Sequence, residues 1–273
     1  MTQNILGQTT KYISNYDPSV LYAIPRSESR KKNGVDESGL FGFDRWNCYE
    51  FSFLNNNGKP IQKVLRFAYS SSSLNIVESK SLKLYLYGFS MTRFFDEKDV
   101  VLTIKTDLEN IILSPIEYID LYDYNSSYSI EKINNKNLLD NLDVEINSYK
   151  PDRLFLKTEK SNNSKKIERF SFLLKTNCPV TGQPDWATVH IKYISNNIIE
   201  DSSLLKYIIS FRNHADYHES CCEKIYSDVY ATSSPKYLLV ECFFTRRGGI
   251  DINPMRVNQP IENPELEKRY WRQ

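Results

Sequence analysis

Residues 78–89 read Glu78-Ser-Lys-Ser-Leu-Lys-Leu-Tyr-Leu-Tyr-Gly-Phe89, and residues 200–211 read Glu200-Asp-Ser-Ser-Leu-Leu-Lys-Tyr-Ile-Ile-Ser-Phe211. Five of these twelve paired positions are identical at a constant offset of 122, and the same offset brings Glu97 opposite Glu219. A stretch that returns in register indicates that one structural unit occurs twice in the chain. We therefore predict an α+β protein built from two similar modules in tandem.

The segments around each copy alternate in polarity or are rich in β-branched and aromatic residues, which predicts strands. The predicted strands are 46–53, 63–69, 100–106, 189–194 and 237–245. Residues 204–212 have helical spacing, whereas 81–89 fit a helix or a strand.

Two polar regions frame these elements. The first 40 residues are rich in Ser, Asn, Lys and Gly, and we predict that they form an irregular arm. A second polar stretch, from about 123 to 165, predicts the boundary between an N-terminal module (1–155) and a C-terminal module (156–273).

The composition of the 273 residues is typical of a soluble globular protein. A formal net charge of +1 gives no reason to expect a nucleic acid or a membrane surface as a partner. No run of about 18 apolar residues is present, and the first residues lack the pattern of a signal peptide. The five cysteines are an odd number without framework spacing, which predicts reduced thiols in the cytoplasm.

Cys178 lies in the most constrained segment, Leu174-Lys-Thr-Asn-Cys-Pro-Val-Thr-Gly-Gln-Pro-Asp-Trp186. Three turn formers, Pro179, Gly182 and Pro184, separate this thiol from the carboxyl of Asp185. Cysteine is a strong nucleophile near neutral pH, so a thiol and an acid in fixed relation suggest addition to an electrophilic carbon followed by protonation. The alternative is a buried cysteine beside a tight turn.

The two copies of the repeat differ in their polar residues. The first has Ser79-Lys80 where the second has Asp201-Ser202, and the second has His218-Glu219 where the first has Asp96-Glu97. Each half lacks what the other retains. Our hypothesis is one composite site assembled from both halves, in one chain or across a dimer.

Four motifs occur together and in order: Glu78-Ser-Lys-Ser-Leu-Lys-Leu-Tyr-Leu86, Cys178-Pro-Val-Thr-Gly-Gln-Pro-Asp-Trp186, Ser210-Phe-Arg-Asn-His-Ala-Asp-Tyr-His-Glu219 and Thr245-Arg-Arg-Gly-Gly-Ile-Asp-Ile-Asn-Pro254. This set resembles the 7-cyano-7-deazaguanine reductases, the nitrile reductases of queuosine biosynthesis, in their long two-module form. The resemblance runs from Leu6-Gly-Gln-Thr-Thr-Lys-Tyr12 to Arg256. It implies tandem tunnelling-fold (T-fold) modules, a homodimer, and reduction of the nitrile to an aminomethyl group with two NADPH in tRNA modification.

The resemblance also implies individual roles. It makes Cys178 the nucleophile that forms a covalent thioimide, and Asp185 the proton donor. It places substrate contacts at Val77, Glu78, Ser79, His218 and Glu219. A carboxylate can accept two hydrogen bonds from the N1–H and 2-amino edge of a guanine-like base, and we favour Glu219 for that role, with Glu78 in support. Taken alone, Glu78 is a carboxylate at a helix start.

No Gly-x-Gly-x-x-Gly follows a predicted strand, so a Rossmann dinucleotide site is not supported. Arg246-Arg247-Gly248-Gly249 combines two guanidiniums with a glycine backbone that a phosphate can approach. The resemblance implies NADPH contacts from Ser79, Lys80, Arg247 and Gly248. Arg247→Ala is then expected to raise the NADPH requirement more than it disturbs adduct formation.

The proposed thiol has an electrostatic problem. An ordinary cysteine is only a few per cent thiolate at neutral pH, and carboxylates at Asp185, Glu78 and Glu219 oppose its ionisation. We expect His218 and Lys80 to supply compensating positive charge, and Cys178 and Asp185 to titrate as a coupled pair.

Three other functions are consistent with parts of the sequence. A thiol hydrolase would use Cys178, a histidine and Asp185 without a cofactor. A non-catalytic purine-binding module would not need the thiol. A zinc site would take Cys178, Cys221, Cys222 and His218, but adjacent cysteines are poor metal spacing, so we predict no metal.

Overall fold

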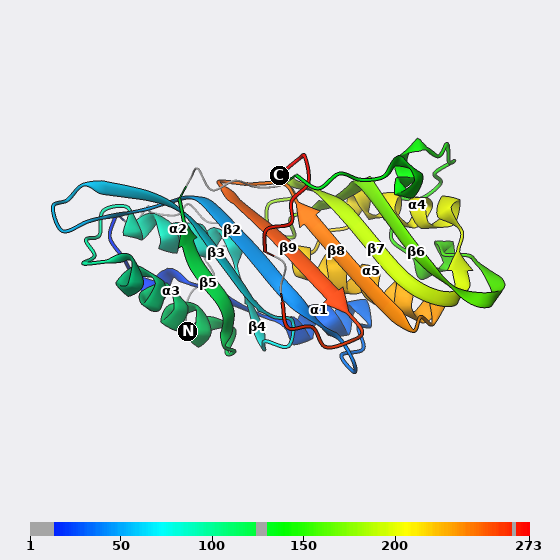
Figure 1. Ribbon diagram of the computed structural model, residues 1–273, viewed down its shortest axis with the longest axis horizontal. Coiled ribbons are helices and arrows are strands. Elements are labelled where there is room, and N and C mark those ends of the chain that lie inside the picture. Colours follow the sequence, from blue (N-terminus) through cyan, green and yellow to red (C-terminus); the bar gives the residue numbers. More distant parts are fainter. Residues whose placement is uncertain (1–13, 124–129, 264–265) are drawn as a thin grey trace.

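One antiparallel sheet of seven strands runs through the described part of the chain, in the order β5-β3-β2-β9-β8-β7-β6 (Figure 1). This computed structural model describes residues 14–123, 130–263 and 266–273, so the Leu6–Tyr12 part of the resemblance lies outside it. The strands are β2 (Phe41–Leu54), β3 (Pro60–Ser70), β5 (Ile116–Tyr122), β6 (Thr158–Asn177), β7 (Pro184–Ile199), β8 (Tyr237–Phe244) and β9 (Ile250–Val257). A separate two-stranded sheet pairs β1 (Ala23–Pro25) with β4 (Asn75–Val77).

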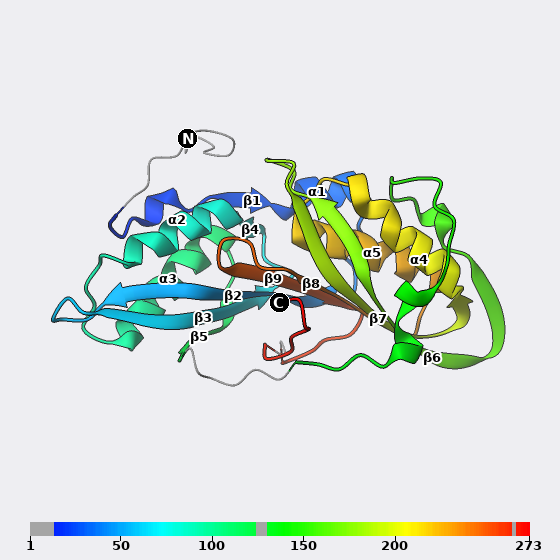
Figure 2. The ribbon, with the colours of Figure 1, turned by 90° about the horizontal axis from the view of Figure 1, so that it is seen from above.

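The helices cover one face of the large sheet (Figure 2). The α-helices are α1 (Arg26–Asn33), α2 (Ser79–Phe89), α3 (Glu97–Ile112), α4 (Asp201–Ile209) and α5 (His218–Ser233). Short 3-10 helices are η1 (Pro18–Val20), η2 (Asn135–Asn137), η3 (Leu139–Asn141), η4 (Arg153–Phe155) and η5 (Ser210–Asn213). The predicted class, α+β with antiparallel strands backed by helices, is confirmed.

The repeat is visible in individual hydrogen bonds. The order β2-β3-α2-α3-β5 recurs as β6-β7-α4-α5-β8, and α2 and α4 begin 122 residues apart. Ser81 Oγ donates to the Glu78 carbonyl at 2.7 Å and accepts the Tyr22 N–H at 3.0 Å. Ser203 Oγ donates to the Glu200 carbonyl at 2.9 Å and accepts the Lys157 N–H at 3.1 Å. The identical serines therefore make the same pair of hydrogen bonds at the start of the equivalent helix in each module.

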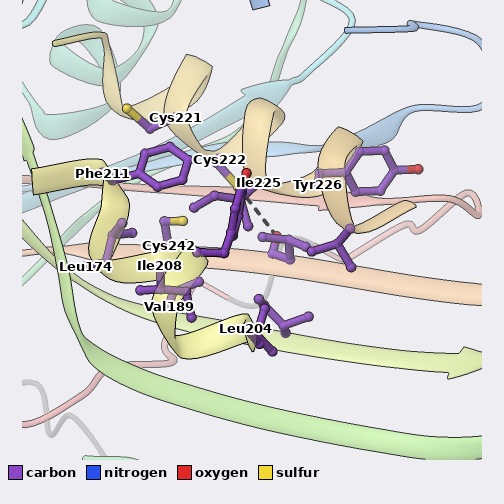
Figure 3. Close-up of a cluster of buried hydrophobic side chains, with 14 of the residues drawn as sticks. Leu174, Val189, Leu204, Ile208, Phe211, Cys221, Cys222, Ile225, Tyr226 and Cys242 are labelled. Atoms are coloured by element: carbon purple, nitrogen blue, oxygen red, sulfur yellow. Dashed lines mark hydrogen bonds between the residues drawn. The ribbon is translucent and has the colours of Figure 1, made fainter. Parts of the chain in front are cut away.

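Each module has its own apolar core. Tyr85 and Phe89 of α2 lie in the first core, and the equivalent Tyr207 and Phe211 lie in the second. Three cysteines, Cys221, Cys222 and Cys242, are buried in the second core among aliphatic side chains (Figure 3). The two cores remain separate clusters under one continuous sheet.

The modules join where β9 of the second pairs with β2 of the first. This pairing sets Trp46 opposite Ile252 and Cys48 opposite Ile250. The sheet therefore continues across the junction, and the two helical layers meet above it. The boundary at 155/156 stays a prediction.

The expected strand at 100–106 is wrong, because these residues form the first half of α3. Its buried residues, Val100, Ile104, Leu108 and Ile112, recur every four positions, which is the spacing of one helix face. Their β-branched side chains favoured a strand locally, and packing of that face against the core overrides this weak preference.

The expectation of an irregular arm over the first 40 residues is also wrong for part of that stretch. β1 and α1 are regular elements, and Arg26 and Arg30 of α1 are buried. The polar composition suggested exposure. Arginines are rarely buried unless paired, and the buried acids that pair with these two, Asp44 and Glu223, lie outside the polar stretch.

Candidate active site

A cavity that opens to solvent lies at the junction of the two modules. Residues of the first module form one side of it: Trp46, Ile76, Val77, Glu78, Ser79 and Lys83. Residues of the second module form the other: Cys178, Pro179, Val180, Asp185, Asp216, Tyr217, His218, Glu219, Arg247, Ile250 and Ile252. A single chain therefore assembles a cavity from both repeats, and this geometry supports the composite-site hypothesis without a second chain.

Cys178 begins the turn that links β6 to β7. Its N–H donates to the Gln183 carbonyl at 2.8 Å, and its carbonyl accepts the Gly182 N–H at 3.0 Å. Gly182 has a φ of 68°, a left-handed conformation that favours glycine. The turn formers noted in the sequence thus close a tight hairpin loop that holds the thiol in one place.

The turn also provides the donors that stabilise a thiolate. Partial burial raises the pKa of Cys178, but hydrogen bonds from the hydroxyl and amide of Thr181, from Arg247 and from the Val180 amide together bring it below the usual value for a thiol. Backbone amides and Arg247 therefore do what we expected of His218 and Lys80.

Asp185 faces the same cavity from β7. The hairpin pairs Thr176 with Asp185, so a separation of seven residues in sequence becomes proximity across the strands. The carboxylate is 6% exposed. Its Oδ1 accepts from Arg247 Nη1 at 2.9 Å, and its Oδ2 lies 3.4 Å from His218 Nε2. Arg247 also lowers the pKa of Cys178, so this guanidinium acts on both the thiol and the acid.

His218 is the first residue of α5 and stacks on Phe244, with ring centroids 3.7 Å apart. Burial lowers its pKa, and the nearby Asp185 only partly opposes this effect. The imidazole is therefore neutral at neutral pH and does not supply the positive charge expected from the sequence. Its Nδ1 is buried without a hydrogen-bond partner among the described residues.

Glu219, the next residue of α5, is 3% exposed. Within residues 14–123, 130–263 and 266–273, no side chain of another residue donates a hydrogen bond to its carboxyl. Burial and the negative charge of Asp44 raise its pKa to about 8, although Arg26 and Arg256 act in the opposite direction. A buried carboxyl of this kind is costly unless a ligand completes its hydrogen bonds.

Glu78 has a second task besides lining the cavity. Its two oxygens accept the N–H groups of Lys80 at 2.9 Å and Ser81 at 2.7 Å, which caps the start of α2. The simple interpretation of Glu78 as a helix-start carboxylate therefore holds. Of the two glutamates, Glu219 is the one whose carboxyl accepts no hydrogen bond from another residue in the described part of the chain.

A second cavity adjoins the first and shares Lys83 and Ile250 with it. Gly248 and Gly249 line it with φ values of 61° and 77°. A Cβ on Gly248 would stand 3.1 Å from Cε of Lys83, so the bare backbone is what lets this lysine approach. Lys83, Arg247 and exposed glycine amides form a surface that fits a phosphate group.

Lys83 is the residue that the sequence analysis missed. Lys80 does not line either cavity, whereas Lys83, one helical turn further along α2, lines both. Burial and the charge of Arg247 lower the pKa of Lys83. The sequence did contain a signal for Lys83. It follows Ser79 by four residues, which places the two side chains on one face of a helix.

Comparisons with known proteins give the class of the chain. The family model described as "Nitrile reductase, 7-cyano-7-deazaguanine-reductase N-term" matches residues 12–120, and the model "QueF-like protein" matches residues 184–263. Among solved structures, the archaeosine synthase QueF-Like in the apo form matches 37% of this chain with a TM-score of 0.33 and 18% identity. That structural likeness is too small to carry an argument.

Curated relatives match over almost the whole chain. The NADPH-dependent 7-cyano-7-deazaguanine reductase of Coxiella burnetii is 40% identical over 93% of this chain and 91% of its own length. The enzyme of the same name from Dechloromonas aromatica is 42% identical over 95% of this chain and 92% of its own length. The one from Paraburkholderia phymatum is 42% identical over 96% of both chains. The chain belongs to the family of NADPH-dependent 7-cyano-7-deazaguanine reductases.

Proposed function

We propose that this protein reduces the nitrile of 7-cyano-7-deazaguanine to the aminomethyl group of 7-aminomethyl-7-deazaguanine, with NADPH as the reductant, in tRNA queuosine biosynthesis. The observation that carries the proposal is a cavity that holds three groups together: an activated thiol, an acid beside it and a buried glutamate without a partner. Family membership supplies the substrate class.

The thiol acts first. The sulfur of Cys178 bonds to the nitrile carbon while one carbon–nitrogen π bond breaks and the nitrogen takes a proton, which gives a covalent thioimide. Asp185 receives the proton of the thiol and passes it to that nitrogen, so the step leaves the net charge of the cavity unchanged. Arg247 acts on both groups, because it donates to the Asp185 carboxylate at 2.9 Å and lowers the pKa of the thiol.

NADPH, when bound, would supply two hydrides, which together with two protons from solvent convert the former nitrile group to an aminomethyl group. Ser79, Lys83, Arg247 and the backbone of Gly248 are the residues that would hold it, and all four line the two adjoining cavities. A contact from Lys80 stays a prediction. Regeneration of the thiolate between the two reductions again depends on the donors of the Thr181 turn.

Glu219 binds the base in this proposal. Its carboxylate accepts the N1–H and 2-amino hydrogens of the deazapurine, which completes the hydrogen bonds that the protein leaves open. Glu78, already occupied as a helix cap, plays a supporting part. Val77, Ser79 and His218 complete the surroundings of the base as cavity-lining residues.

The direct test supplies 7-cyano-7-deazaguanine and NADPH to the purified protein and follows both compounds. We expect NADPH oxidation that depends on the nitrile, with two NADPH consumed for each amine formed. Release of ammonia without NADPH oxidation would instead identify a thiol hydrolase. Tight binding without any conversion would identify a purine-binding module.

Substrate affinity is expected to rise with pH. Glu219 is protonated below its pKa of about 8, and a protonated carboxyl cannot accept both hydrogens from the base. Binding below that pH therefore requires loss of a proton, which costs about 1.4 kcal/mol, or a factor of ~10 in affinity, for each pH unit. Calorimetric titration of a Cys178→Ala protein from pH 6 to 9 measures this slope without adduct formation.

Glu219→Gln is the control for that slope. The amide keeps the shape of the side chain but does not titrate, so its affinity should be lower at pH 8 and nearly constant across the range. An unchanged slope in this variant would show that another group carries the pH dependence.

Arg247→Ala is expected to weaken two steps. The structure alters the earlier expectation, because Arg247 contacts Asp185 at 2.9 Å as well as lining the cavity. Loss of its guanidinium raises the NADPH requirement and also slows adduct formation, each by about 10-fold or more, as is typical for the loss of a charged hydrogen bond. Steady-state KM for NADPH and single-turnover adduct formation report the two effects separately.

Arg246→Ala is the matched control. Arg246 is adjacent but lies over the ring of Tyr49, with its guanidinium carbon 3.7 Å from the ring centroid. It does not line either cavity. The KM for NADPH and the rate of adduct formation should therefore stay near those of the unaltered protein. The same losses in both variants would contradict a specific role for Arg247.

No helix in the described ranges is long and apolar enough to cross a membrane. The homodimer, the absence of a nucleic-acid partner and the cytoplasmic location stay predictions.

A further inference from the structure

Five charged residues form a buried group where the two modules meet, and we call them the junction cluster. They are Arg26 and Arg30 of α1, Asp44 of β2, Glu223 of α5 and Arg256 of β9. Every one of them is 6% exposed or less. None of the five lines the catalytic cavity.

The cluster is held by charge-assisted hydrogen bonds between the modules. Arg256 Nη1 donates to Asp44 at 2.8 Å, and its Nε and Nη2 donate to Glu223 at 3.0 and 2.9 Å. Arg30 donates twice to Glu223, at 3.0 and 2.8 Å, and Arg26 pairs with Asp44. α1 and β2 belong to the first module, and α5 and β9 to the second, so these bonds clamp α5 onto the first module.

Glu219 lies on α5 one turn before Glu223, on the same helix face. Glu223 is compensated by arginines, which hold its pKa down at about 2 despite its burial. Glu219 is within the electrical influence of the same group: Asp44 opposes its ionisation, whereas Arg26 and Arg256 favour it.

The phenols of Tyr69 on β3 and Tyr217 before α5 also act on Glu219. On its cavity side, Glu219 shares the lining with Glu78, Lys83, Asp185, Asp216, His218 and Arg247. The pKa of each phenol is raised, chiefly by burial, so both are neutral at physiological pH. Among charged groups, Asp44, Arg26 and Arg256 of the junction cluster act on Glu219 most strongly. The third arginine, Arg30, also pairs with Glu37 at 3.0 Å, which balances the positive charge that the cluster has in excess.

We propose that the junction cluster positions Glu219 and sets whether its carboxyl is charged. The affinity for the substrate then depends on residues that do not contact the substrate. This inference rests on the proposed function, because Glu219 is taken as the group that binds the deazapurine. The five residues are positioning residues, and their effect reaches the substrate only through Glu219.

The test compares substitutions of opposite charge in the full-length Cys178→Ala background, with 7-cyano-7-deazaguanine as the ligand. Asp44→Asn removes the negative charge that opposes ionisation, so the pH midpoint of binding should fall by about one unit. Arg26→Met removes a favourable positive charge, so the midpoint should rise by about one unit. At a fixed pH between the two midpoints, the affinities should differ by ~10-fold or more.

Controls separate this effect from damage to the fold. Lys31→Met removes the same charge from an exposed position of α1 and should leave the midpoint unchanged. Arg26→Lys keeps the charge and should restore most of the wild-type profile. Should both truncations unfold, Ser73→Ala decides, because it removes only the hydroxyl that accepts from Arg26 at 2.9 and 3.0 Å and should give a smaller upward shift.

Two outcomes would overturn the inference: midpoints that stay at the wild-type value in folded variants, or shifts of the same sign for Asp44→Asn and Arg26→Met. Neither would touch the proposed function. That function fails on a different result, in which the Cys178→Ala protein binds no 7-cyano-7-deazaguanine at any pH and the unaltered protein oxidises no NADPH.

Discussion

Cys178→Ala is expected to abolish the covalent adduct and to lower turnover by at least ~10³-fold, because a thiolate is the strongest nucleophile that the cavity offers to a nitrile carbon. The substrate should still bind, since Glu219 and the walls of the cavity are unchanged. Intact-protein mass spectrometry after mixing with 7-cyano-7-deazaguanine, without cofactor, measures the adduct directly. The mass of the unaltered protein should increase by the mass of one molecule of 7-cyano-7-deazaguanine, and the mass of the variant should not change.

Cys242→Ala is the control for thiol loss as such. Cys242 is fully buried in the second core, and its pKa is far above that of an ordinary thiol, chiefly because of burial. This variant should lose some stability and keep the adduct. If Cys178→Ala converted the substrate at the native rate, the thioimide proposal would be wrong. If the adduct were lost only in Cys242→Ala, the nucleophile would not be Cys178.

Asp185→Asn is expected to slow turnover by about 10²- to 10⁴-fold, the range over which a positioned proton donor contributes to a rate. The amide cannot take the proton of the thiol, and it also ends the ion pair with Arg247 that now measures 2.9 Å. Deazapurine binding should persist. Single-turnover kinetics would show a slow approach to the adduct rather than its absence.

Asp201→Asn makes a matched control for that variant. Asp201 is also an aspartate paired with an arginine, with Arg169 Nε at 2.7 Å, but it stands at the start of α4 outside the catalytic cavity. It should keep the full rate. If Asp185→Asn turned over as fast as Asp201→Asn, Asp185 would have no part in proton transfer.

Much of the fold was open to sequence reasoning where the signal was local. The sequence predicted a helix at 204–212 and allowed a helix or a strand at 81–89. The structure has a helix at both places, and the two helices begin 122 residues apart, at Asp201 and Ser79. The turn formers after Cys178 predicted a rigid thiol, and the β6–β7 hairpin holds it. Such features depend on residues within one turn or one loop, so their physical causes are all contained in a short stretch of chain.

The secondary-structure predictions failed where contacts with residues far away in the sequence outweighed the local preference of the chain. The β-branched run at 100–106 became helical because every fourth residue of α3 is needed in the first core. The polar arm contains α1 because Glu223, almost 200 residues later, provides a partner for Arg30. No window of the sequence contains both members of such a pair.

The amino-acid sequence by itself determined which reactive groups this protein carries. They are a thiol, an acid and two glutamates, divided between two copies of one structural unit. The sequence also determined the family to which the chain belongs. Only the tertiary structure decided that one chain closes the cavity, that Lys83 lies in it, and that Glu219 is left without a partner while Glu223 is compensated. The reason is that burial and electrostatic influence act through space, between side chains that the fold alone brings within reach of one another.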